Sequence, residues 1–218
     1  MKYPKIFGHG PYIGTTGYNN HTRDFFRGLS THHPLKFRNF TVGSSWEGMN
    51  EEPHNGEPYL LDVDKNILHQ QTYYTSDGDM VDGEMYPNNG ENFDHNVNLI
   101  LMETNHHYFY HNYKGPKIAY NVWESTRQPE GFFNKLLEFD QIWVPSQWQA
   151  DCTIEQGADP DKVKVVPEGV DTETFYPEDP QTTLDYVDGR FKFIHFGRWD
   201  YRKSTKEIIN TFLKEFTP

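Results

Sequence analysis

The chain of 218 residues has room for one large domain, or for one domain and part of a second. Hydrophobic residues make up 35% and aromatic residues 16% of it, which is enough to bury a core and excludes a wholly disordered chain. Acidic residues outnumber basic ones by 32 to 20, which argues against binding of nucleic acid or anionic membrane. Cys152 is the one cysteine, which excludes a disulfide framework and a cysteine-rich zinc site.

Short apolar runs alternate along the chain with stretches of helical periodicity. Strands are predicted at residues 5–7, 36–42, 97–102, 118–123, 141–145, 163–166 and 191–196. Helices are predicted after Asn19 or Asn20, either of which could cap the first one, and then at residues 129–137, 147–156 and 205–216. This alternation indicates βα units, so we expect an α/β fold whose mainly parallel, Rossmann-like sheet is flanked by helices.

Two segments depart from the alternation. Residues 44–96 are rich in Gly, Pro, Asn and acids and predict a long irregular excursion, in which residues 59–63 and 69–74 could pair as short strands. Residues 172–189 combine prolines and acids with few apolar side chains, which is typical of a linker. We therefore predict an N-terminal domain over residues 1–171, a linker over 172–189, and the truncated beginning of a second domain over 190–218.

The stretch 8–17 is rich in glycine and lies between the first predicted strand and helix. Its Gly14-x-x-Gly17 segment could bring backbone N–H groups close to an anion at the helix N-terminus, or could be a plain tight turn. It does not match the dinucleotide-binding fingerprint, because Ile13 stands where the third glycine of that motif should be. In the helix that follows, Phe25, Phe26 and Leu29 share one face, which predicts a core contact.

The second half of the chain carries four motifs in a specific order. They are Asn121-Val122-Trp123-Glu124-Ser125, then Asp140-Gln141-Ile142-Trp143-Val144-Pro145-Ser146, then Val165-Val166-Pro167-Glu168-Gly169-Val170-Asp171, and finally Gly197-Arg198 followed by Lys203-Ser204. In this order and at these separations the series resembles the retaining GT-B glycosyltransferases of family 4. The resemblance covers residues 118–175 and 191–216 closely and residues 8–17 loosely.

The resemblance implies a hexosyltransferase with the N-terminal domain of a GT-B enzyme and the start of its C-terminal domain. Such an enzyme transfers a hexose from a UDP- or GDP-linked sugar to a hydroxyl of a glycan, lipid or other acceptor, with retention and without a metal or other cofactor. The residues that would bind the donor phosphates are Arg198, Lys203, Gly14 and Gly17. Glu124 would be the catalytic carboxylate, and the remaining residues expected in the donor and acceptor cleft are His9, Tyr18, Trp123, Ser146, Glu168 and Gly169.

Several of these residues also have a structural interpretation. Arg198 and Lys203 could belong to a solvated turn, and Trp123 with Glu124 could be a packed ring beside a surface acid. Ser146 is expected to cap the helix that follows it. Ser204 departs from the family, which usually has glycine there, but a serine could still cap the next helix.

Three further groups resemble functional motifs without the expected context. Glu207 and Glu215 match the spacing of the acidic pair that binds the donor sugar in the family, but they come several βα units too early, and we treat the match as coincidence. In residues 103–111, His107 and His111 are four positions apart and could share a helix face, as metal ligands sometimes do, but the segment is so aromatic that we interpret it as packed or facing the acceptor. The acid-rich residues 77–84 miss the spacing of a calcium loop, and we interpret them as a hydrophilic loop.

The sequence leaves two other functional classes open. One is a module that binds a glycan or a partner without catalysis, because most of the donor domain lies beyond the part of the family that this chain matches. The other is a split enzyme whose missing C-terminal domain is supplied by another chain. Residues 1–10 lack the apolar run of a signal peptide, and no run of about 18 apolar residues occurs, so we expect a soluble, cytoplasmic protein.

Overall fold

The computed structural model describes residues 3–14, 16–40, 61–74, 80–84, 96–102, 115–173, 175–177, 191–197, 199 and 201–216. The chain divides into two units, Met1–Thr174 and Phe175–Pro218, and this boundary falls inside the predicted linker. No helix among the described residues is both long and apolar enough to cross a lipid bilayer.

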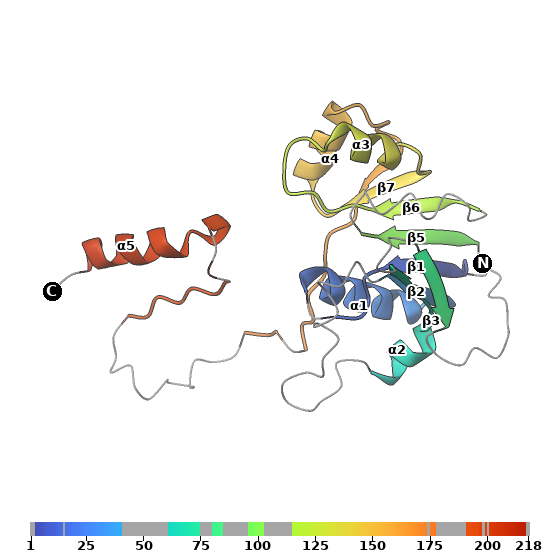
Figure 1. Ribbon diagram of the computed structural model, residues 1–218, viewed down its shortest axis with the longest axis horizontal. Coiled ribbons are helices and arrows are strands. Elements are labelled where there is room, and N and C mark those ends of the chain that lie inside the picture. Colours follow the sequence, from blue (N-terminus) through green and yellow to red (C-terminus); the bar gives the residue numbers. More distant parts are fainter. Residues whose placement is uncertain are drawn as a thin grey trace. The chain divides into compact units, whose positions relative to one another are not determined.

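The strands of the described residues form one eight-stranded sheet in the order β4-β3-β2-β1-β5-β6-β7-β8. In chain order they are β1 Ile6–Gly10, β2 Leu35–Phe40, β3 Leu68–Tyr74, β4 Met80–Glu84, β5 Val97–Leu101, β6 Lys117–Tyr120, β7 Gln141–Val144 and β8 Val163–Val165. Every neighbouring pair is parallel except β3 with β4. The order reverses between β1 and β5, so the predicted α/β, Rossmann-like fold is confirmed (Figure 1).

Helices cover both faces of this sheet. In the first unit they are α1 Gly17–Ser30, α2 Asp62–Ile67, α3 Glu130–Leu136 and α4 Gln147–Glu155. Along β5, Leu99 and Leu101 belong to the core cluster that contains Phe26 of α1, whereas Ile100 belongs to the cluster that contains Leu136 of α3. Because side chains alternate along a strand, β5 is buried on both sides, which explains the apolar run from Leu99 to Leu101.

A close approach of backbone and aromatic rings fixes α1 on the sheet. A Cβ atom at Gly8 of β1 would lie 2.5 Å from ring atoms of both Phe26 and Phe37. Glycine at this position therefore lets the two rings, whose centroids are 4.6 Å apart, pack directly against the strand. The predicted core face of α1 is confirmed, since Phe26 is buried and Phe25 and Leu29 pack against the same cluster.

The N-terminus of α1 corrects one expectation. The N-cap is Thr16 rather than Asn19 or Asn20, and Asn19 is its partner in a capping box. The Asn19 side chain accepts a hydrogen bond from the Thr16 N–H at 3.0 Å. Asparagine three residues inside the helix can do this because its carbonyl oxygen replaces that of the usual glutamate or glutamine.

The predicted irregular excursion contains regular structure that extends the sheet. Residues 69–74 are a strand, as predicted, within β3, but residues 61–63 are not, because α2 begins at Asp62. The acid-rich stretch that we interpreted as a loop includes β4, which pairs antiparallel with β3. Residues 59–60, 77–79 and 103–111 lie outside the described residues.

The second unit contains η3 Tyr201–Lys203 and the predicted helix α5 Thr205–Glu215. The strand predicted at residues 191–196 is wrong, because the structure gives these residues no strand hydrogen bonding. A strand is stabilised by a neighbouring strand, and the described part of this unit offers none. Phe193 instead contacts Phe212 of α5, with ring centroids 5.4 Å apart.

Ser204 occupies the N-cap position of α5 but does not cap it with its side chain, contrary to expectation. Its backbone is left-handed, with φ of 51°. Glycine adopts this conformation most easily, which gives a physical reason for the glycine that the resembled family usually has here.

Candidate functional site

The carboxyl ends of the parallel strands bring the predicted cleft residues to one edge of the sheet. Trp123 and Glu124 follow β6, Ser146 follows β7, and Glu168 follows β8. The three strands are direct neighbours in the sheet. Open α/β sheets bind ligands at this edge, so these loops form the candidate site of the first unit.

The loop after β1 is held by three side chains from two other elements, β2 and α1. The Asn39 side-chain oxygen accepts hydrogen bonds from the N–H groups of Tyr12 at 2.7 Å and Ile13 at 2.9 Å. The Asn19 amide donates to the carbonyls of Pro11 and Ile13, and the Arg23 guanidinium donates to those of Tyr12 and Gly14. The loop is therefore fixed by the protein itself before any ligand binds.

The two glycines predicted to bind phosphate differ in their surroundings. Gly14 has φ of 134°, and a Cβ atom there would lie 2.7 Å from the Asn19 side-chain oxygen. Gly17, in the first turn of α1, has no such neighbour within 4 Å. Packing alone therefore requires glycine at position 14 but not at position 17.

A buried charged network, formed by Asp64 and Arg27, holds Tyr12 of the same loop. The Tyr12 hydroxyl donates to Asp64 Oδ1 at 2.5 Å, and the Arg27 guanidinium donates to both carboxylate oxygens at 2.8 and 2.6 Å. Burial, followed by the hydrogen bond to Asp64, raises the pKa of Tyr12. Burial would raise the pKa of Asp64, but hydrogen bonds from Arg27, Tyr12 and the Leu61 N–H outweigh it and lower that pKa.

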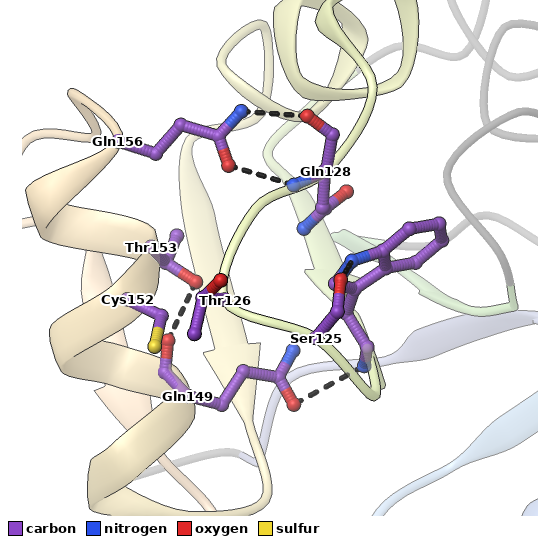
Figure 2. A pocket seen from close by; sticks show the side chains of 8 residues that line it. Ser125, Thr126, Gln128, Gln149, Cys152, Thr153 and Gln156 are labelled. Carbon is purple, nitrogen blue, oxygen red and sulfur yellow. Dashed lines mark hydrogen bonds between the residues drawn. The ribbon is translucent and has the colours of Figure 1, made fainter.

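Two glutamines of the α4 region hold the loop after β6 through its backbone, as Figure 2 shows. Gln149 accepts from the Trp123 N–H at 3.2 Å and donates to the Asn121 carbonyl at 2.8 Å. Gln156 makes the equivalent pair with the N–H and carbonyl of Gln128, both at 2.8 Å. The loop that carries Glu124 is thus fixed at both ends.

A shallow pocket lies between this loop and α4. The residues that line it are uncharged: Trp123, Ser125, Thr126, Gln128, Gln149, Cys152, Thr153 and Gln156. Several polar groups of the pocket form hydrogen bonds within the protein. The Trp123 indole N–H, for example, donates to Ser125 Oγ and to the Arg127 carbonyl. These hydrogen bonds stabilise the loop after β6.

The other predicted residues have mixed surroundings. Glu124 is exposed to solvent, and the Ser146 hydroxyl accepts from the Gln149 N–H at 3.2 Å, which confirms its predicted capping role. His9 is fully buried within β1, with Nε2 3.5 Å from Asn98 Oδ1. Gly169 is exposed, and Tyr18 donates weakly to the Val122 carbonyl at 3.5 Å.

In the second unit, Lys203 is exposed at the end of η3. Arg198 lies outside the described residues. The donor-phosphate assignment of this pair stays a prediction. Among the described residues, no group of three or more His, Cys, Asp or Glu side chains is arranged to hold a metal ion.

His21 of α1 is a site residue that the sequence did not indicate. Its Nδ1 lies 3.1 Å from Glu168 Oε1, and its ring packs edge-on against Tyr120 at 4.9 Å between centroids. The i, i+3 spacing from Tyr18 places both residues on one face of α1, but nothing local in the sequence identifies Glu168 as the neighbour of His21. The pair joins the first helix to the loop after the last strand.

Comparison with known proteins finds similarity to a solved structure. No family model matches the chain, and no curated protein matches it. Among solved structures, the chain is similar to the crystal structure of Anabaena Alr3699/HepE in complex with UDP, at 12% sequence identity and a TM-score of 0.47. The match covers 78% of this chain and 45% of that chain, so this chain spans less than half of the length of Alr3699/HepE.

The class of the first unit follows from its own sheet. A parallel sheet whose order reverses between β1 and β5, with loops fixed at its carboxyl edge, defines a doubly wound α/β domain of Rossmann-like type.

Proposed function

We propose that the protein is a glycosyltransferase of the GT-B type, which transfers a hexose from a nucleotide sugar to a hydroxyl acceptor with retention and without a metal. One observation carries the proposal. The motifs that resemble this class are separate in the sequence, yet Trp123 with Glu124, Ser146 and Glu168 follow three adjacent parallel strands at the ligand-binding edge of the sheet.

The chemistry of these residues suits the reaction. The difficult step is departure of the nucleoside diphosphate, and cations placed beside the leaving phosphates stabilise the charge that develops there. Arg198 and Lys203 are the proposed cations. Glu124 supplies an exposed carboxylate on a loop that Gln149 holds in place. A group that acts on a bound sugar needs such a fixed position.

The test is release of nucleoside diphosphate from a panel of UDP- and GDP-linked hexoses, with simple glycans as acceptors. UDP-hexoses come first, because UDP is the nucleotide in the Alr3699/HepE structure. Glu124→Gln and Lys203→Ala are each expected to reduce kcat/KM by about a hundredfold or more, in the range found when one stabilising group is removed from an active site. Addition of EDTA should leave the rate unchanged.

Lys206→Ala is the matched control for Lys203→Ala. Lys206 is an exposed lysine on α5 that is not assigned to the site, so its loss should change the rate less than twofold. If the two lysine variants behave alike, the phosphate role of Lys203 is wrong. If the protein binds glycans but never releases nucleoside diphosphate from any donor, it is a carbohydrate-binding module and the proposed enzyme is refuted.

A further inference from the structure

Glu168 lies at the carboxyl edge of the sheet with a half-exposed carboxylate. Its side chain is 47% exposed, whereas the His21 side chain that contacts it is only 12% exposed. One carboxylate oxygen is therefore held from the protein side. The exposed part of the carboxylate remains open to a ligand at this edge.

The surroundings of His21 fix the position of its ring. It packs edge-on against Tyr120 at 4.9 Å and against Phe25 at 6.0 Å, measured between ring centroids. The Tyr120 hydroxyl in turn donates to the Val166 carbonyl at 2.6 Å. The same aromatic group thus fixes both the backbone of the loop after β8 and, through His21, the Glu168 carboxylate.

The hydrogen bonding of His21 defines its role further. Since carboxylate oxygens only accept, the contact with Glu168 requires a proton on Nδ1. Nε2 is buried and has no hydrogen-bond partner among the described residues, so a second proton there would be poorly accommodated. Burial accordingly lowers the pKa of His21, although Glu168 and Asp24 act in the opposite direction. The ring is a neutral donor to Glu168 near pH 7.

We propose that His21 is a positioning residue, which orients the Glu168 carboxylate so that it accepts hydrogen bonds from the hydroxyl groups of a bound sugar. The inference rests on the proposed glycosyltransferase function and adds a recognition role to that site. A carboxylate accepts hydrogen bonds from hydroxyl groups but repels phosphate. Glu168 therefore recognises the sugar and not the diphosphate, whether the sugar belongs to the donor or to the acceptor.

Two variants separate the hydrogen bond from the packing. His21→Phe keeps a ring against Tyr120 and Phe25 but cannot donate. His21→Asn loses the ring but places an amide N–H near the position of Nδ1. His32→Ala, at an exposed histidine just after α1, is the control and should behave like the unmodified protein.

The experiment measures KM and kcat for donor and acceptor separately, together with the affinity for UDP alone. We expect His21→Phe to raise one KM about tenfold, as loss of a hydrogen bond of roughly 1.4 kcal/mol would, with kcat and UDP affinity within about twofold. His21→Asn should stay within about threefold of the unmodified protein. The KM that rises shows which of the two sugars Glu168 contacts.

The background variant Glu168→Gln completes the test. If His21 acts through Glu168, His21→Phe has no further effect once the carboxylate is gone. The inference is overturned if His21→Phe has the KM values of the unmodified protein, or if His21→Phe and His21→Asn raise the same KM equally. It is also overturned if His21→Phe still raises that KM in the Glu168→Gln background. Absence of any transfer by the unmodified protein refutes the proposed function and this inference together, whereas normal transfer by His21→Phe refutes this inference alone.

Discussion

Replacement of Asp64 by alanine should destabilise the first unit by about 3–5 kcal/mol, the range for breaking a buried ion pair by removing one partner. Asp64 has no exposed surface and accepts hydrogen bonds from Tyr12, Arg27 and the Leu61 N–H. Its loss leaves the Tyr12 hydroxyl buried without this acceptor, which costs about 1–3 kcal/mol. It also leaves the Arg27 guanidinium, 23% exposed, without its buried partner.

The chain offers a matched control on the same guanidinium. Asp24 also pairs with Arg27, at 3.5 Å, but its side chain is 60% exposed. Exposed ion pairs contribute about 0–1 kcal/mol, so Asp24→Ala should change stability by no more than that. The measurement is the free energy of unfolding in urea, followed by circular dichroism. Equal effects of Asp24→Ala and Asp64→Ala would refute the argument from burial.

The same pair predicts a pH dependence. The pKa of Asp64 lies below its ordinary value of 3.8 in the folded chain. An acid whose pKa is lowered by folding stabilises the fold above its ordinary pKa, and this contribution disappears as the pH falls through the lowered value. The unmodified protein should therefore lose stability below about pH 4 more steeply than Asp64→Ala does. Parallel pH profiles for the two proteins would contradict the assignment.

Three further perturbations follow from the packing and backbone. Gly8→Ala should lower the free energy of unfolding by about 1–3 kcal/mol, because the new Cβ atom is forced against two rings. Gly28→Ala, in open space on α1, should raise it by up to about 1 kcal/mol. Unfolding in urea compares the two variants. Ser204→Gly should stabilise the second unit by about 1 kcal/mol and raise its helix content, because glycine adopts the left-handed backbone of this position without strain. An unchanged helix content and melting temperature would contradict that reasoning. Gln149→Ala should lower the free energy of unfolding by about 1–3 kcal/mol and speed amide hydrogen exchange at Trp123. Gln147→Ala, on the exposed face of α4, is the control. Equal effects of the two variants would count against the role of Gln149 in holding the loop.

The regular elements were largely predictable because their signals are local. The apolar run of β5, the helix period of α3 and α4, and Ser146 as a cap all depend on residues within one or two turns of each other. The failures lie where a local signal was weak or ambiguous. An acid-rich stretch became β4 because β3 offers it a partner along the sheet edge, and pairing outweighs propensity.

The strand expected at residues 191–196 failed for the complementary reason. Its content of aromatic and apolar residues suits a strand, but composition alone supplies no hydrogen-bonding neighbour. Helix α5 forms beside it because a helix satisfies most of its own backbone groups.

The sequence by itself determined the fold class and the order of the loops, since alternating periods and glycine-rich turns restrict a chain to a parallel α/β sheet. It also predicted that Glu124 and Ser146 directly follow strands. Only the tertiary structure could bring Tyr12 to Asp64, 52 residues later, or His21 to Glu168. Those contacts depend on which strands become neighbours and on how α1 packs across them, and no local pattern encodes that choice.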